Sequence, residues 1–185
     1  MATGTTLDFE STQNYSARVE VCDTGRPVLC SYATMDLQVK DVNDPPVLSG
    51  SSVCVVENSP AGSPVGSPLQ GYDEDIIGKT FGGWYNLTYS IEAGDSRKVF
   101  RIAPLTGQIE VARGTRGLLN YESNDANRFE LVVRVSDQGG QGEPKLHAEA
   151  RVVVDVTNIN EPPIASPQTL QIAENAPRSP RQSDE

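Results

Sequence analysis

The chain has 185 residues and a formal net charge of −10 at pH 7, with 25 acidic residues against 15 basic ones. Because the sequence contains no basic cluster, nucleic acids and anionic lipid surfaces are excluded as favourable partners. The length suits one or two domains, since a unit of roughly 115 residues is long enough to bury its own core.

The first ten residues, MATGTTLDFE, lack the basic and apolar regions of a signal peptide. No run in the sequence approaches the ~20 consecutive apolar residues that a membrane-spanning helix needs. We expect both features to belong to a longer parent protein, of which this chain is a fragment.

Three cysteines lie in the first third of the chain. Cys22 and Cys30 flank the turn-rich stretch DTGRPVL, so they could close a small loop in an oxidising compartment, while Cys54 occupies an apolar strand position. On spacing alone, three reduced cysteines are nearly as well supported. Two glycosylation sequons, Asn14-Tyr15-Ser16 and Asn86-Leu87-Thr88, favour a secreted context.

The sequence contains an internal repeat with the length of a domain. The stretch DPPVLSGSSVCVVENSP (44–60) recurs within TNINEPPIASPQTLQIAENAP (157–177), and each matched residue, from Asp44 with Glu161 onwards, lies 117 residues before its counterpart. A constant offset of this size indicates modules too long for a solenoid unit. We predict the end of a first unit (1–40), a linker (41–46), a complete unit (47–157), a second linker (158–163) and a truncated third unit (164–185), with disorder at its end.

The complete unit is predicted to consist of short strands. FELVVRVSD (129–137) alternates Phe129, Leu131, Val133 and Val135 with more polar residues, which is the period-two pattern of a half-buried strand. HAEARVVVDV (147–156) places Ala148, Ala150, Val152, Val154 and Val156 on one side, and NLTYSI (86–91) does the same with Leu87, Tyr89 and Ile91. The other candidates are SVCVVE, PLQGY, VFRI and GQIEV.

Seven such strands, separated by turn signals, predict an all-β fold: a seven-stranded Greek-key β-sandwich of immunoglobulin-like shape with flanking partial repeats. The Cys-Trp-Cys core of true immunoglobulin domains is missing, because Trp84 follows Phe81-Gly82-Gly83 in a predicted loop and Cys54 has no partner in its unit.

The acidic motifs of the complete unit occur in a characteristic order. VVENSPAG, YDEDIIG, LTYSI, FRIAPLTGQIEV, LLNYE, FELVVRVSDQGG and NINEPP succeed one another over about 120 residues, and LDFE (7–10) and CDTG (22–25) belong to the flanking copy. This order resembles the cadherin repeat: an initial Glu-Asn, a D-x-D, an L-D-x-E, a D-x-G and a terminal D-x-N-D linker. The resemblance implies a cadherin-type sandwich and calcium as the cofactor.

The stretch VKDVNDPPVL (39–48) then has a physical explanation. Calcium takes roughly six to eight oxygen ligands, and the prolines keep the linker extended and outside any central strand. An extended linker can offer Asn43 to one ion and Asp44 to another, while the carbonyl groups of Val42 and Pro45 stay free to ligate. For this first junction the resemblance implies the ligands Asp8, Glu10, Val42, Asn43, Asp44, Pro45, Asp73, Asp75 and Asp137.

Six of these ligands are carboxylates, and each unscreened pair would repel by about 1 kcal/mol or more at such distances. Without cations we therefore expect the first junction to splay. The family usually has Asn-Gly near Gly83–Trp84, where a backbone carbonyl reaches an ion, and the change here is a mild departure because only the carbonyl is needed.

The second junction is expected to be incomplete. Its implied ligands are Glu57, Asn120, Glu122, Asn160 and Glu161. Three positions depart from the family pattern: Asn120 replaces an Asp, Glu161 replaces the linker Asp, and Asn158 replaces the leading linker Asp. The third unit ends before its D-x-D. At the other end of the chain, Asp23 lacks the junction partner that would share its ion.

An enzyme is the least favoured class. His147 is the only histidine, and no Ser-His-Asp, Cys-His or zinc-type cluster can be assembled around it. The resemblance instead implies calcium-dependent cell adhesion on the extracellular side of the plasma membrane. The partners would be calcium ions and other cadherin-like repeats in cis or in trans, with the membrane reached only through a parent protein's transmembrane segment.

Two alternatives remain open at this point. The chain could be a rigid spacer or tether that carries no adhesive surface itself, or a calcium-dependent glycan-binding module of a surface protein. Trp84 is not expected to act as a swapped adhesive tryptophan, because it lies inside an internal unit.

Overall fold

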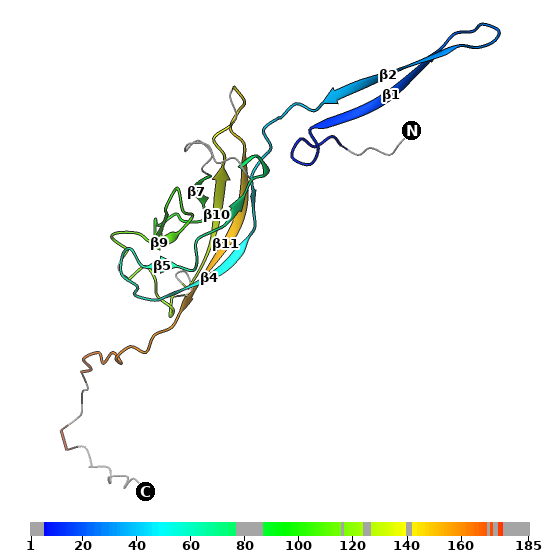
Figure 1. The fold of residues 1–185 in the computed structure, drawn as a ribbon. Coiled ribbons are helices and arrows are strands. Elements are labelled where there is room, and N and C mark those ends of the chain that lie inside the picture. The colour runs from blue at the N-terminus through cyan, green and yellow to red at the C-terminus, as the bar shows by residue number, and fades with distance from the viewer. Residues whose placement is uncertain are drawn as a thin grey trace.

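The computed structural model describes residues 6–76, 87–115, 117–123, 127–139, 142–169, 171 and 174–175. Its described residues form a strand hairpin, one β-sandwich and an extended C-terminal segment that leads away from the sandwich (Figure 1). The loop around Gly83–Trp84, the sequon residue Asn86 and the predicted disorder after residue 175 fall outside the described residues.

The sandwich contains two main sheets. One sheet has four strands in the order β4-β11-β10-β7, and the other has three strands in the order β5-β9-β8, with a small β3-β6 pair beside them. The strands are β3 (Val47–Leu48), β4 (Ser51–Val56), β5 (Pro64–Val65), β6 (Gly71–Tyr72), β7 (Thr88–Ala93), β8 (Phe100–Ile102), β9 (Ile109–Val111), β10 (Arg128–Ser136) and β11 (His147–Thr157). The only helix among the described residues is the 3-10 turn η1 (Glu74–Ile76). The all-β prediction is therefore confirmed.

The core lies between the two sheets, where the period-two pattern placed it. Phe129, Leu131, Val133 and Val135 of β10 are all buried, and the adjacent strand β11 buries Val152, Val154 and Val156. Ala148 and Ala150 are partly buried against the same cluster. The rings of Phe100 and Phe129 meet edge to face, with centroids 4.9 Å apart, and join the two sheets.

A glycine lets β7 leave the four-stranded sheet. The pairing of β7 with β10 shifts register between Val132 and Val133. Gly94 follows directly after β7 with a φ of 89°, and a Cβ atom at this position would overlap the carbonyl oxygen of Glu130. Both the left-handed backbone and the close approach require glycine here.

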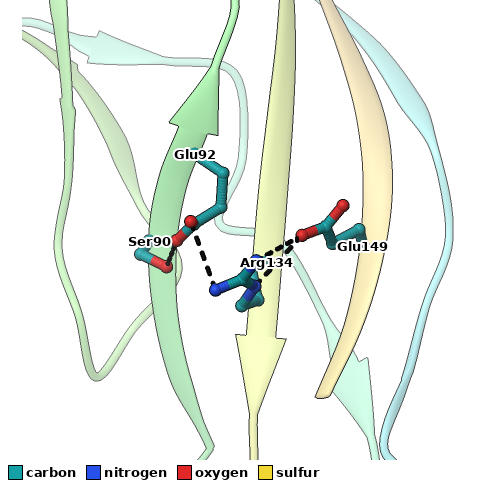
Figure 2. Close-up of polar contacts among 4 residues, drawn as sticks. All are labelled: Ser90, Glu92, Arg134 and Glu149. Carbon is teal, nitrogen blue, oxygen red and sulfur yellow. Dashed lines mark hydrogen bonds and ion pairs between the residues drawn. The ribbon is translucent and has the colours of Figure 1, made fainter.

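The outer face of the four-stranded sheet carries charges that are paired with one another. Arg134 on β10 contacts Glu92 on β7 at 3.2 Å and Glu149 on β11 at 2.7 Å, and Ser90 donates to Glu92 (Figure 2). Arg128 pairs with Asp155 at 2.8 Å in the same way. Exposed pairs of this kind add little stability, but they neutralise this face and match neighbouring strands in register.

The hairpin consists of β1 (Asn14–Cys22) and β2 (Cys30–Gln38), which are antiparallel and paired over their whole length. Its two faces differ sharply. One face is apolar and exposed, with Tyr15, Val19, Val21, Met35 and Leu37. The opposite face is polar, and there the guanidinium of Arg18 lies 4.0 Å from the ring centre of Tyr32.

This hairpin corresponds strand by strand to β10 and β11. Leu37 lies 117 residues before Val154, and each is paired with an aromatic residue, Tyr15 and Phe129 respectively. The apolar face of the hairpin therefore corresponds to the face of β10 and β11 that packs into the core of the complete unit. This likeness supports the prediction that residues 1–40 are the end of a first unit.

The described residues contain no helix with the length and apolar character that a membrane crossing requires.

Candidate metal centre at the unit junctions

The first linker is fastened to the sandwich through its backbone. The amide of Asn43 donates to Oε2 of Glu143 at 2.6 Å, and the amide of Asp44 donates to Oδ2 of Asp75 at 2.7 Å. Pro46, two residues after Asp44, is fully buried. The carbonyl groups of Val42 and Pro45 accept no hydrogen bond from the described residues.

Asp137 is held by its own loop at the end of β10. Its Oδ1 accepts hydrogen bonds from the amides of Gly139 at 2.8 Å and Leu146 at 2.9 Å. Its Oδ2 faces the linker and accepts from Nδ2 of Asn43 at 2.9 Å. The D-x-G motif thus fixes one carboxylate oxygen and presents the other to the junction.

The D-x-D motif lies on the turn that includes η1. The amide of Asp75 donates to Oδ1 of Asp73 at 3.0 Å, and both side chains are buried. Oδ2 of Asp73 is buried and has no hydrogen-bond partner among the described residues. Burial raises the pKa of Asp73, the amide of Asp75 opposes this shift, and the neighbouring charges of Asp75, Asp137 and Asp44 raise the pKa further.

The carboxylates of Glu10, Asp41 and Asp75 converge. One oxygen of each lies within 4.8 Å of the others. Asp41 was not among the predicted ligands, although it is the leading Asp of the D-x-N-D motif and that position was the available signal. Glu143 was also missed, because no motif marks it.

Asp8 lies at the same junction in a different orientation. It lines a cleft of about 410 Å³ together with Glu10, Tyr72 and Glu74. Its carboxylate accepts from the hydroxyl of Ser11 at 2.7 Å and from the amide of Ser11 at 3.1 Å, and these bonds lower the pKa of Asp8. The structure therefore brings Asp8 to the junction, with its carboxylate on Ser11.

The donor set at the first junction fits a hard divalent cation. Among the described residues, no lysine or arginine forms an ion pair with Asp73, Asp75 or Asp137. A buried carboxylate oxygen without a partner, surrounded by further carboxylates, is costly unless a cation compensates for it. Oxygen-only ligands of this kind are those that calcium selects.

Three glutamates converge at the second junction, at the opposite end of the sandwich. Oxygens of Glu57, Glu122 and Glu161 lie within 4.8 Å of one another. Glu57 is buried and accepts from the amides of Ile159 at 2.7 Å and Tyr121 at 3.0 Å. These two bonds, in that order, lower the pKa of Glu57, against the opposing effect of desolvation.

Amide side chains take part in this second cluster. Nδ2 of Asn58 donates to Glu161 at 2.7 Å, and Nδ2 of Asn158 lies 3.5 Å from Oε1 of Glu122. Asn158 occupies the position that corresponds to Asp41 in the first linker. At the second junction the amide of Asn158 thus contacts the carboxylate of Glu122, whereas at the first junction the equivalent residue, Asp41, adds a further carboxylate to the cluster.

The remaining predicted ligands of the second junction are not drawn into the cluster. Oδ1 of Asn120 accepts from the amide of Glu122 at 2.9 Å and so shapes the local turn. Asn160 is exposed and makes no hydrogen bond with the described residues.

The hairpin repeats the loop geometry of Asp137. Oδ1 of Asp23 accepts from the amides of Gly25 at 3.1 Å and Leu29 at 3.0 Å. The adjacent residues Cys22 and Cys30 form a disulfide, which settles the pairing that the sequence left open, and Cys54 is free and exposed. Because their sulfurs are bonded to each other, these two cysteines are not metal ligands.

Comparison with known proteins agrees with this architecture. The family model for the cadherin domain matches residues 51–157. Human Protocadherin-1 is 32% identical over 165 residues, which cover 87% of this chain and 14% of the relative. The Drosophila melanogaster Protocadherin-like wing polarity protein stan is 33% identical over 158 residues, which cover 84% of this chain and 4% of the relative.

A solved structure agrees with these relatives. The protocadherin gammaB7 EC3-6 cis-dimer structure superposes with a TM-score of 0.55 and 27% identity, over 84% of this chain and 35% of that chain. The present chain thus spans 14% and 4% of the length of these two relatives and 35% of the solved chain. Cadherin-family relatives are adhesion proteins and not enzymes, in agreement with the sequence prediction. On the matched domain and the shared β-sandwich, the chain belongs to the cadherin family.

Proposed function

We propose that this chain is a calcium-dependent adhesion module, in which calcium ions stiffen the junctions between tandem extracellular repeats. The observation that carries the proposal is the buried oxygen Oδ2 of Asp73, which has no hydrogen-bond partner in the described part of the chain and lies among the charges of Asp75, Asp137 and Asp44. A divalent cation would compensate for this buried charge.

The residues that would hold calcium come from both sides of the first linker. Glu10 belongs to the hairpin side, Asp41 and Asp44 belong to the linker, and Asp73 and Asp75 belong to the sandwich. Asn43 and Asp137, with the carbonyl groups of Val42 and Pro45, would complete the oxygen ligands. Ligands from the hairpin side and from the sandwich can bind the same calcium ion only when the two sides are docked against the linker. Calcium binding would therefore favour the docked arrangement over a splayed one.

The second junction would bind calcium more weakly than the first. Its glutamates receive hydrogen bonds from backbone amides and from Asn58, as the first-junction carboxylates do from other donors, but here Asn158 also puts a neutral donor near Glu122 where the first linker has the carboxylate of Asp41. These donors satisfy part of the charge that a cation would otherwise neutralise. We therefore assign Glu57, Glu122 and Glu161 to a weaker or partial site, with the expected ligands Asn120 and Asn160 lying outside the cluster.

At the level of the cell, the proposal places the chain outside the plasma membrane as part of a larger protein. The family relationship supports adhesion through other cadherin repeats, in cis or in trans. A spacer without an adhesive surface is the main alternative. The charged side chains on the outer face of the four-stranded sheet pair with one another, so that face offers little electrostatic attraction to a partner protein. Bead aggregation with and without calcium distinguishes the two, and a glycan array tests the third possibility, a glycan-binding module.

The decisive experiment is a calcium titration of the chain followed by melting temperature and small-angle scattering. At a calcium concentration ten times the dissociation constant, each occupied site adds about 1.4 kcal/mol to the free energy of unfolding. We expect calcium to raise the melting temperature and extend the particle. Asp44→Ala should abolish most of both effects, whereas Asp36→Ala, a matched change on the exposed polar face of β2, should leave them intact. A titration curve that is flat for the unmodified chain contradicts the proposal.

A further inference from the structure

The sequon Asn14-Tyr15-Ser16 lies at the start of β1, and its residues alternate between the two faces of the hairpin. Tyr15 is on the apolar face, so Asn14 and Ser16 project together from the polar face, because side chains two residues apart in a strand point the same way. Both are exposed. Among the described residues, neither side chain has a hydrogen-bond partner.

The complete unit shows that this position stays exposed when a sandwich is complete. Asn14 is paired with Gln38, and the corresponding pair in the complete unit is Arg128 with Asp155. The side chain of Arg128 is 56% exposed there. Two residues along, the equivalent of Ser16 is Glu130, whose side chain is 49% exposed. Covering the apolar face of the hairpin would therefore leave Asn14 in solvent.

The disulfide between Cys22 and Cys30 is an independent observation on the same hairpin. Disulfides form and persist in the oxidising secretory and extracellular compartments, which are also where Asn-X-Ser sequons are glycosylated. The hairpin thus combines an accessible acceptor amide, the required hydroxyl residue and a marker of the right compartment.

We propose that Asn14 carries an N-linked glycan. The donor would be an oligosaccharide attached to a lipid pyrophosphate. Nδ2 of Asn14 forms a bond to the anomeric carbon of the first sugar, the bond from that carbon to the phosphate oxygen breaks, and the amide loses one proton as the lipid pyrophosphate leaves. The chain's own contribution is the sequon and its exposed position.

The glycan would stand beside the first junction. Gln13, the residue before Asn14, lines the same cleft as Asp8 and Glu10, and its carbonyl accepts from the amide of Val39 at 2.9 Å. A bulky, hydrated glycan at this point would keep other proteins away from the polar face of the hairpin and from this side of the junction. An adhesive contact would then have to use another surface.

The test is secretion of the whole chain, behind a heterologous leader, from animal cells. The Asn86→Gln variant should still lose mass when N-glycans are removed enzymatically, and the Asn14→Gln/Asn86→Gln variant should lose none. In heavy-oxygen water, the enzyme should convert Asn14 of the unmodified chain to labelled Asp. Ser16→Ala in the Asn86→Gln variant should abolish the modification at Asn14, while Ser16→Thr should retain it.

A secreted protein whose Asn14 peptide is entirely unmodified would overturn the inference. Peptide mapping of the unmodified chain gives this answer even if a variant fails to leave the cell. The inference shares only the extracellular location with the proposed function. Calcium binding can be measured on unglycosylated protein, so the two proposals can fail separately.

Discussion

Nδ2 of Asn43 donates to Oδ2 of Asp137 over 2.9 Å, although the two residues are 94 positions apart in the sequence. One belongs to the linker and the other to the loop after β10. The neutral amide of Asn43 therefore holds the linker against the loop of Asp137 without the help of a cation.

Replacing Asn43 by alanine should loosen the junction in the calcium-free chain. The change removes a hydrogen bond to a charged acceptor, and such bonds contribute about 1.5–3 kcal/mol. We expect a lower free energy of unfolding in urea with chelator present. Val42→Ala is the control, because Val42 is exposed. Equal stabilities for Asn43→Ala and the unmodified chain would show that the contact contributes nothing.

Asp73→Asn should have opposite effects with and without calcium. The pKa of Asp73 in the folded chain lies above its ordinary value of 3.8, so folding favours the protonated form. The contribution of Asp73 to the free energy of unfolding is therefore fully present below pH 3.8 and is lost as the pH rises through the raised pKa. In chelator at neutral pH the uncharged variant should therefore melt at a higher temperature than the unmodified chain.

The same variant should gain less from calcium, because it removes a ligand charge. Below pH 3.8 the stability difference in chelator should disappear, since both side chains are then neutral. Melting curves at several pH values, with chelator and with calcium, measure both effects. A variant that is less stable than the unmodified chain in chelator at neutral pH would show that the buried charge is compensated in some other way.

The strands that could be predicted from sequence are those with one buried face. Phe129, Leu131, Val133 and Val135 alternate with more polar residues because β10 has one side in the core, and the alternation records that burial. PLQGY (68–72) was predicted as one strand, but only Gly71–Tyr72 pairs there, and Pro64–Val65 forms a separate strand. Gly66, with a φ of 63°, separates the two.

The junction residues could be assigned from motif spacing, but their orientations could not. Spacing placed Asp8 at the first junction, yet its carboxylate turns to Ser11, which was not an expected ligand. Glu143 was missed because its role depends on how the linker lies against the sandwich, whereas Asp41 could have been found from its leading position in the D-x-N-D motif. Such orientations follow from tertiary contacts between distant segments, which a local pattern does not record.

Glu57→Gln should destabilise the end of the sandwich near the second junction. The lowered pKa of Glu57 means that its charged form is favoured by folding. Its contribution is present above its ordinary pKa of 4.5 and is lost as the pH falls through the lowered value. Glutamine has one acceptor oxygen, so it cannot accept from both Ile159 and Tyr121 in the same way.

The unmodified chain should therefore be the more stable of the two at neutral pH, and the difference should narrow under acid conditions. Urea unfolding at neutral and acidic pH measures the difference, and Glu174→Gln in the exposed C-terminal segment is the control. A difference that does not change with pH would indicate that packing, and not the charge of Glu57, is responsible.

The disulfide between Cys22 and Cys30 should stabilise the hairpin and not the sandwich. It closes a loop between residues that are eight positions apart, and the chain-entropy relation gives about 2.5 kcal/mol for a loop of this size. The Cys22→Ser/Cys30→Ser double variant should therefore lose amide-exchange protection in β1 and β2. Protection in β10 and β11, which are held by the buried core, should stay unchanged.

The internal repeat provides the comparison for this experiment. The pair that corresponds to Cys22 and Cys30 in the complete unit is Ser136 and His147, which hold the same place beside Asp137 without a covalent bond. The core behind β10 stabilises that pair, whereas the apolar face behind β1 is exposed. Amide hydrogen exchange, measured with and without reductant, compares the protection of β1 and β2 with that of β10 and β11 in one sample. Unchanged protection of the hairpin after reduction would mean that cross-strand pairing alone maintains it.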